Sequence, residues 1–208
     1  MSMSPQQAER LYGIDAWGAG YFRVSPQGRL AVHVDRDDRG IDLYALLGRL
    51  RRRRVRLPVL LRFPQILASR VNEIFGAFDG AIEEFGYQGA YRGVFPIKVN
   101  QQRDVVDELV GAGLKRGLGL ESGSKAELAV ALAHRLDRDA YIVCNGYKDK
   151  PYVRLALRGV ALGKKVFMII EKPQEIPLIL DVVKETGLRP LLGIRTRLRA
   201  RCSGKCEK

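Results

Sequence analysis

Five polar residues that could do chemistry recur at a regular spacing in the second half of the chain. Each closes a short apolar run, and together they are Lys98, Glu121, Asn145, Glu171 and Arg195. The set provides an amine, two carboxylates, an amide and a guanidinium, which are groups that bind ions, transfer protons or attack a carbonyl. Any strand also becomes polar where it reaches solvent, so each residue alone could be a boundary marker. Their recurrence in one register favours a common site.

The stretch YRGVFPIKVN, residues 91–100, places Lys98 near the end of a predicted strand. Val94, Phe95 and Ile97 favour strands, and Pro96 cannot donate to a sheet ladder. A surface lysine at a strand terminus is one interpretation. The other is a nucleophilic amine that forms a Schiff base with a carbonyl, for which an electropositive or desolvated pocket would lower its pKa from about 10.4. These residues alone leave both interpretations open.

The elements around the five residues alternate with a period of about 25 positions. Patterns of helical spacing separate the apolar runs, which cover residues 93–99, 117–121, 141–145, 166–171 and 190–196. This alternation predicts parallel βα units, with continuous apolar runs because both faces of each strand are covered. An open doubly wound sheet and a closed (β/α)8 barrel share the pattern, and both place a site at the carboxyl ends of the strands.

Signals for helix ends support this division. Ser124 and Glu127 have the spacing of a capping box at the start of a helix. Pro151 stands near the first turn of the next helical pattern and Gly163 after its last, and Gly187 closes the pattern after that.

The first part of the chain has a different organisation. Two alternating runs predict a hairpin over residues 20–34, and residues 41–54 show helical spacing. Residues 57–64, LPVLLRFP, are a short apolar run that predicts a strand, and residues 65–87 predict a long amphipathic helix.

Composition restricts the class of protein and its partners. With 46% hydrophobic and 28% charged residues and no apolar stretch long enough to span a bilayer, we expect a globular cytoplasmic protein without a membrane partner. The net charge of +13 includes a basic run at residues 49–57. No aromatic-rich RNA motif or zinc-finger spacing accompanies that run, so we expect no nucleic-acid partner. Cys202 and Cys206 form a C-x3-C pair without a second pair of ligands nearby in sequence, and we expect no metal site.

Seven stretches of the sequence carry a resemblance that covers nearly the whole chain. They are residues 12–30, 57–67, 86–110, 117–128, 142–157, 166–176 and 189–205, and PIKVNQQ at residues 96–102 is the most specific piece. The chain resembles the biosynthetic arginine decarboxylases, which depend on pyridoxal 5'-phosphate and share an alanine-racemase-like barrel.

The resemblance implies an α/β fold with a partial (β/α)8 TIM barrel, containing about five of the eight βα units. It implies that residues 1–57 form an N-terminal hairpin and helix segment, with the hairpin belonging to a β-domain. Residues 58–208 would then form the incomplete pyridoxal-phosphate-binding barrel.

The resemblance also implies an activity, the decarboxylation of L-arginine to agmatine and carbon dioxide in polyamine biosynthesis. Lys98 would be catalytic and carry pyridoxal phosphate as a Schiff base, and Glu121, Asn145 and Arg195 would be further cofactor-binding residues. Mg2+ would be an accessory ion without a recognisable site, and the full-length protein would be a homo-oligomer. Another basic amino acid as substrate (ornithine, lysine or diaminopimelate), a non-catalytic cofactor-binding barrel, or a basic nucleic-acid binder are the alternatives.

The sequence departs from the family in its length. Members of the family continue well beyond the SGK at residues 203–205, into the remaining barrel strands, a phosphate-binding loop and a C-terminal domain. We therefore expect that this chain is a truncated or frameshifted product with little or no activity of its own, because an incomplete barrel leaves edge strands unpaired.

Overall fold

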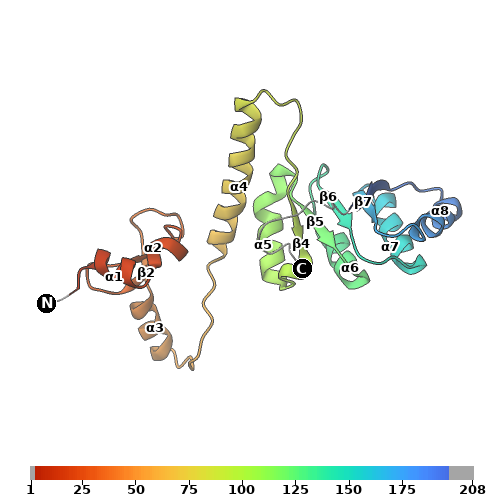
Figure 1. The fold of residues 1–208 in the computed structure, drawn as a ribbon. Helices are drawn as coiled ribbons and strands as arrows, with labels where there is room; N and C mark the ends of the chain where they lie inside the picture. Colours follow the sequence, from red (N-terminus) through yellow and green to blue (C-terminus); the bar gives the residue numbers. More distant parts are fainter. Residues whose placement is uncertain (1–2, 197–208) are drawn as a thin grey trace. The chain divides into compact units, whose positions relative to one another are not determined.

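The computed structural model describes residues 3–196 (Figure 1). The chain divides into two compact units, Met1–Ile74 and Phe75–Lys208. The helix α4 (Pro64–Glu84) crosses this division, whereas the division predicted from the sequence precedes the helix.

The first unit is built on a small antiparallel sheet. Its elements are α1 (Pro5–Leu11), α2 (Ile14–Trp17), β1 (Phe22–Val24), β2 (Leu30–Val32), β3 (Ile41–Asp42) and α3 (Leu43–Arg52). The strand β2 lies in the centre and pairs with β1 and β3. Between β1 and β2 the chain turns through Gly28, which has a φ of +72°. Ile14, Tyr21, Ala31 and Val32 are buried and form the small core of this unit.

The prediction of a strand over residues 57–64 is wrong. The structure has irregular backbone from Val55 to Phe63, and α4 begins at Pro64. A short apolar run becomes a strand only if another strand pairs with it, and no described strand pairs with these residues. Leu60 is 74% exposed here, so the run does not contribute to the core of the described chain.

The second unit is an α/β layer around a five-stranded parallel sheet in sequential order (Figure 1). Its strands are β4 (Val94–Pro96), β5 (Gly119–Ser122), β6 (Tyr141–Cys144), β7 (Lys165–Ile170) and β8 (Leu191–Ile194). The helices α5 (Arg103–Gly113), α6 (Lys125–Ala133), α7 (Lys150–Ala161) and α8 (Glu175–Thr186) connect them, with 3-10 turns η1 (Ile97–Val99) and η2 (Leu114–Arg116). The predicted parallel βα alternation is confirmed.

The predicted helix ends agree with the structure, but the capping box predicted for Ser124 and Glu127 does not form. The Ser124 hydroxyl accepts from the backbone N–H of Glu127 at the start of α6, and the Glu127 carboxylate accepts from Gly123 N–H instead of closing a capping box. Pro151 lies in the first turn of α7, and Gly187 closes α8 with a φ of +69°, in the left-handed region that glycine adopts at little cost.

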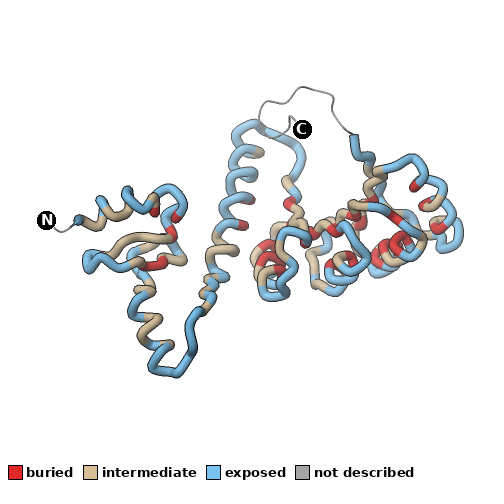
Figure 2. Tube along the Cα trace, turned by 60° about the horizontal axis from the view of Figure 1, so that its bottom comes forward, coloured by how far each residue is buried: buried red, intermediate tan, exposed pale blue. Residues whose placement is uncertain are grey.

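The core of this unit lies between the sheet and its helices, where Figure 2 shows the buried residues in red. Val106, Leu128, Leu157 and Val182 come from successive helices and belong to one cluster with strand residues such as Ile142. Burial alternates along β6 and β7, so only one face of these strands is fully buried in the described chain. The prediction that both faces are covered is therefore wrong for this part, and β8 is largely exposed.

Candidate functional site

The five recurring polar residues lie at the carboxyl ends of the five parallel strands. Glu121 belongs to β5, whereas Asn145, Glu171 and Arg195 directly follow β6, β7 and β8. Lys98 lies two residues beyond β4, in the 3-10 turn η1. Because neighbouring parallel strands end at the same edge of a sheet, all five residues share that edge.

Lys98 and Glu121 form the first contact of this edge. Pro96 pairs in register with Glu121, and the buried side chain of Ile97 anchors the turn that follows. Lys98 Nζ then lies 3.4 Å from Glu121 Oε1. The Lys98 side chain is 64% exposed and its charged partner is an acid, so the desolvated or electropositive pocket expected from the sequence is not formed by the described residues.

Glu171 and Arg195 form the second contact. The backbone N–H of Arg195 donates to Ile170 O at 3.0 Å, which continues the pairing of β7 with β8. Glu171 Oε2 then accepts from the Arg195 guanidinium at 3.3 Å, and Glu171 Oε1 accepts from the backbone N–H of Gly146 at 2.5 Å. The Arg195 side chain is 67% exposed, and no other hydrogen bond to its guanidinium is formed by residues 3–196, so within that range its remaining donors are available to an anion.

Asn145 directly follows β6, the strand between these two contacts. Its backbone N–H donates to Ser122 O at 2.8 Å, and its carbonyl accepts from the Tyr152 hydroxyl at 3.3 Å. Among the described residues no hydrogen bond involves its side-chain amide, so the amide joins neither Glu121 nor Glu171. The structure thus brings the five residues together as two ion pairs with an amide between their strands.

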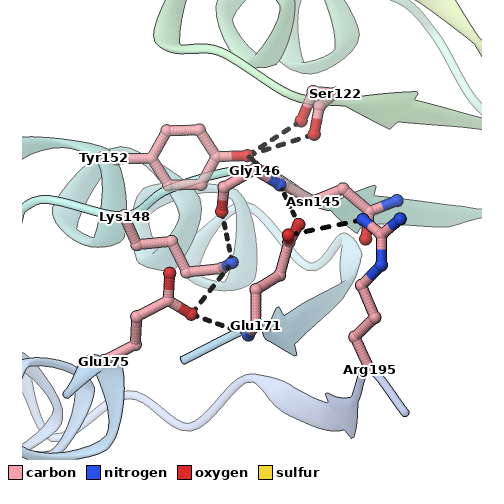
Figure 3. Close-up of polar contacts among 8 residues, drawn as sticks. All are labelled: Ser122, Asn145, Gly146, Lys148, Tyr152, Glu171, Glu175 and Arg195. Atoms are coloured by element: carbon pink, nitrogen blue, oxygen red, sulfur yellow. Dashed lines mark hydrogen bonds and ion pairs between the residues drawn. The ribbon is translucent and has the colours of Figure 1, made fainter. Parts of the chain in front are cut away.

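Lys148 and Glu175, which the sequence did not single out, lie beside Glu171 (Figure 3). Their side chains are 0% and 6% exposed, and Lys148 Nζ lies 3.4 Å from Glu175 Oε2. The available signal is positional, because both follow shortly after a strand end: Lys148 after Asn145, and Glu175 after Glu171. The residue types argue against burial, since lysine and glutamate are almost always exposed.

A second buried group fixes the ends of β5 and β6. The Tyr152 hydroxyl lies 3.2 Å from Ser122 Oγ and 3.3 Å from Ser122 O. Burial raises the pKa of Tyr152 far above its ordinary value and also raises the pKa of the Cys144 thiol. Both groups therefore stay protonated at neutral pH, and they serve to pack and hydrogen-bond.

Two expectations about ions and membranes can be compared with residues 3–196. In that range no group of three or more His, Cys, Asp or Glu side chains could hold a metal ion, so no position for Mg2+ is identified there. Cys202 and Cys206 lie outside the described residues. Within the same range, no helix has the length and apolar character needed to cross a bilayer.

Comparison with known proteins identifies the family. The family model described as "Pyridoxal-dependent decarboxylase, pyridoxal binding domain" matches residues 71–206. The chain belongs to the pyridoxal-dependent decarboxylases. The four residues expected to bind the cofactor, Lys98, Glu121, Asn145 and Arg195, all fall within the matched part of this decarboxylase chain.

The relatives of this decarboxylase chain include several biosynthetic arginine decarboxylases. A biosynthetic arginine decarboxylase of Rhodopirellula baltica is 49% identical over 201 residues, which are 96% of this chain and 30% of the relative. One of Tolumonas auensis is 46% identical over 98% of this chain and 33% of its own length. The crystal structure of the biosynthetic arginine decarboxylase SpeA from Campylobacter jejuni superposes with a TM-score of 0.81 at 34% identity, over 90% of this chain and 32% of that one. The chain thus spans about a third of the length of its relatives, and the resemblance seen in its sequence is confirmed.

Proposed function

We propose that this chain is the cofactor-attachment part of an enzyme that decarboxylates L-arginine to agmatine and carbon dioxide in polyamine biosynthesis. The observation that carries the proposal is the exposed amine of Lys98 at the shared edge of the parallel strands, in contact with Glu121. The names of relatives at 42–49% identity support arginine as the substrate.

The groups at this edge fit pyridoxal phosphate, which carries an aldehyde, a phosphate and a ring nitrogen. The Lys98 amine can attach the aldehyde, and the exposed guanidinium of Arg195 can bind an anionic oxygen. When bound, the cofactor supplies an electron sink for the electron pair that remains as carbon dioxide leaves. Glu121 holds the Lys98 ammonium before attachment, and Asn145 offers its free amide to the cofactor or substrate.

We further propose that β4–β8 are five of the eight strands of a barrel and that the β1–β3 sheet belongs to a separate β-domain. Leu191, Leu192 and Ile194 of the edge strand β8 are exposed, as expected of a strand that pairs with a further one. The half-buried face of β6 and β7 would become the inside of the barrel. A barrel over residues 58–208, a cytoplasmic location and a homo-oligomer of the full-length protein stay predictions.

Cofactor attachment is tested by treating the 208-residue chain with pyridoxal phosphate and then with borohydride, which fixes a carbon–nitrogen double bond as a stable amine. We expect a new absorbance band before reduction and a peptide modified at Lys98 after it. Lys98→Ala should abolish both signals, whereas Lys115→Ala, an exposed lysine before β5, should keep them. Modification that persists in Lys98→Ala at the wild-type level would refute the assignment.

Substrate choice is tested in a chimera in which this chain replaces the matching 201 residues of the Rhodopirellula baltica protein. We expect the chimera to release agmatine from arginine and the 208-residue chain to release none, because the described residues supply only one part of the edge of a barrel. Preferred release of carbon dioxide from ornithine, lysine or diaminopimelate would refute arginine as the substrate.

A further inference from the structure

The buried ion pair of Lys148 and Glu175 has no role in the function proposed so far. Removing two charges from water has a large free-energy cost, and a buried pair recovers this cost only when all its polar atoms are satisfied. Glu175 Oε1 is buried without a hydrogen-bond partner among the described residues. A gain in folding stability therefore does not explain the pair. A buried polar group of this kind calls for another role, such as fixing the position of neighbouring groups.

Each member of the pair binds the backbone of a neighbouring strand end. Lys148 Nζ donates to Gly146 O at 2.7 Å, in the loop after β6. Glu175 Oε2 accepts from the backbone N–H of Glu171 at 2.9 Å, in the loop after β7. The pair thus connects these two loops through hydrogen bonds to their backbones (Figure 3).

The Glu171 side chain completes a closed ring with the same atoms. Its Oε1 accepts from Gly146 N–H, while Gly146 O accepts from Lys148. Lys148 contacts Glu175, which in turn accepts from Glu171 N–H. Both the backbone and one carboxylate oxygen of Glu171 are therefore fixed by the ring, and only Oε2 remains to point outward.

That free oxygen is the one that accepts from Arg195. Arg195 is largely exposed, and an exposed arginine has considerable side-chain entropy unless a fixed acceptor orients it. We propose that Lys148 and Glu175 are positioning residues, which fix the Glu171 carboxylate so that it orients the Arg195 guanidinium toward the anionic part of the cofactor or substrate. The identity of that anion rests on the proposed function, whereas the ring and its effect on Arg195 do not.

The test separates positioning from stability by neutralising both members of the pair. Lys148→Met or Glu175→Leu alone leaves one buried charge unpaired and should destabilise the chain. The double variant Lys148→Met/Glu175→Leu replaces the pair by apolar residues of similar size, which is often neutral for stability. It also removes the donor to Gly146 O and the acceptor for Glu171 N–H, so the ring is lost.

The first readout needs no cofactor. Phenylglyoxal modifies free guanidinium groups, and tandem mass spectrometry gives the rate at Arg195. We expect the modification rate of Arg195 to rise about threefold or more in the double variant. The same rise is expected in Glu171→Gln, because the loss of the negative charge weakens the contact with the Arg195 guanidinium. The control Lys165→Gln/Asp139→Asn removes an exposed ion pair at the opposite ends of the strands and should leave the rate unchanged. An unchanged rate in a folded double variant would overturn the proposal, whether or not the chain binds pyridoxal phosphate.

The second readout is the dissociation constant of pyridoxal phosphate. We expect the double variant to bind about tenfold more weakly even if its unfolding midpoint equals that of the wild type, because a displaced guanidinium loses its aligned contacts. In an Arg195→Ala background the same double substitution should have no further effect. Additive losses would show that the pair acts independently of Arg195 and would overturn the proposal. If the wild-type chain binds no cofactor, the proposed function fails while the phenylglyoxal experiment still decides this inference.

Discussion

The amine of Lys98 and the carboxylate of Glu121 lie 3.4 Å apart at the ends of neighbouring parallel strands. The ion pair keeps the lysine over the strand edge, and it also competes with an aldehyde for the amine. Because Lys98 is mostly exposed, water and salt weaken the attraction, and the pair is worth at most about 1 kcal/mol.

We therefore expect Glu121→Gln to speed the attachment of pyridoxal phosphate to Lys98 by up to about fivefold at low ionic strength. The measurement is the growth of the absorbance band under excess cofactor. At about 1 M salt the difference should vanish, since charges are then screened over about 3 Å. Glu84→Gln, which removes the same charge from the end of α4, should attach at the wild-type rate. Slower attachment in Glu121→Gln would mean that the carboxylate assists the reaction.

The placement of the candidate residues at the strand ends was predictable because it depends on local properties of the sequence. Parallel strands such as β6 and β7 are apolar along their length, and the first polar residue after each, Asn145 or Glu171, marks the edge that they share. The same reasoning failed for residues 57–64, because an apolar run does not show whether a partner strand exists.

The interactions that organise the site join residues of the second unit that are far apart in sequence. No local sequence pattern contains them. Lys148 and Glu175 are separated by 27 positions, and their residue types predict exposure. Tyr152 lies on a helical face that the pattern identifies as apolar, but its hydroxyl is used by Ser122, 30 positions earlier. Lys98 was placed correctly at a strand end, whereas its exposure depends on the 3-10 turn that follows.

The loop after β6 offers a test of how closely the strand ends approach. Gly146 has a φ of +78°, and a Cβ added there would lie 2.4 Å from Gly123 O, a backbone atom that cannot move alone. We expect Gly146→Ala to cost about 1–2 kcal/mol of strain in the left-handed region and about 1–3 kcal/mol more for the close approach. Urea unfolding followed by circular dichroism measures the loss.

Gly163→Ala is the matched control, because Gly163 has a φ of +77° and open space around its position. It should show the strain alone, about 1–2 kcal/mol. Equal losses in the two variants would show that the loops after β5 and β6 are farther apart in solution.

The Tyr152 hydroxyl connects Ser122 with the carbonyl of Asn145, so its removal should loosen the ends of β5 and β6. We expect Tyr152→Phe to lower the free energy of unfolding by about 1–2 kcal/mol, with Ser122 O retaining the Asn145 N–H as a donor. Tyr147→Phe, at a residue that is 73% exposed, should change it by less than about 0.5 kcal/mol. Urea unfolding of both variants measures these changes. An unchanged free energy of unfolding in Tyr152→Phe would mean that the buried hydroxyl is dispensable for stability.

Asp149 should make the stability of the second unit depend on pH in acid. Its Oδ2 accepts from Lys125 Nζ at 2.6 Å and its Oδ1 accepts from the Tyr152 N–H at the start of α7, and these contacts hold the pKa of Asp149 below its ordinary value of 3.8. Because the folded-state pKa is lowered, the contribution of the carboxylate to the free energy of unfolding is fully present above the ordinary pKa. It is lost as the pH falls through the lowered value.

Asp149→Asn keeps a helix cap but removes the charge. We expect the urea midpoint of Asp149→Asn to lie below that of the wild type at pH 7 and the gap to close below about pH 4. Glu108→Gln, which removes a carboxylate without an ion pair among the described residues, should show no such closing gap. A gap that widens on acidification would contradict the assigned contacts of Asp149.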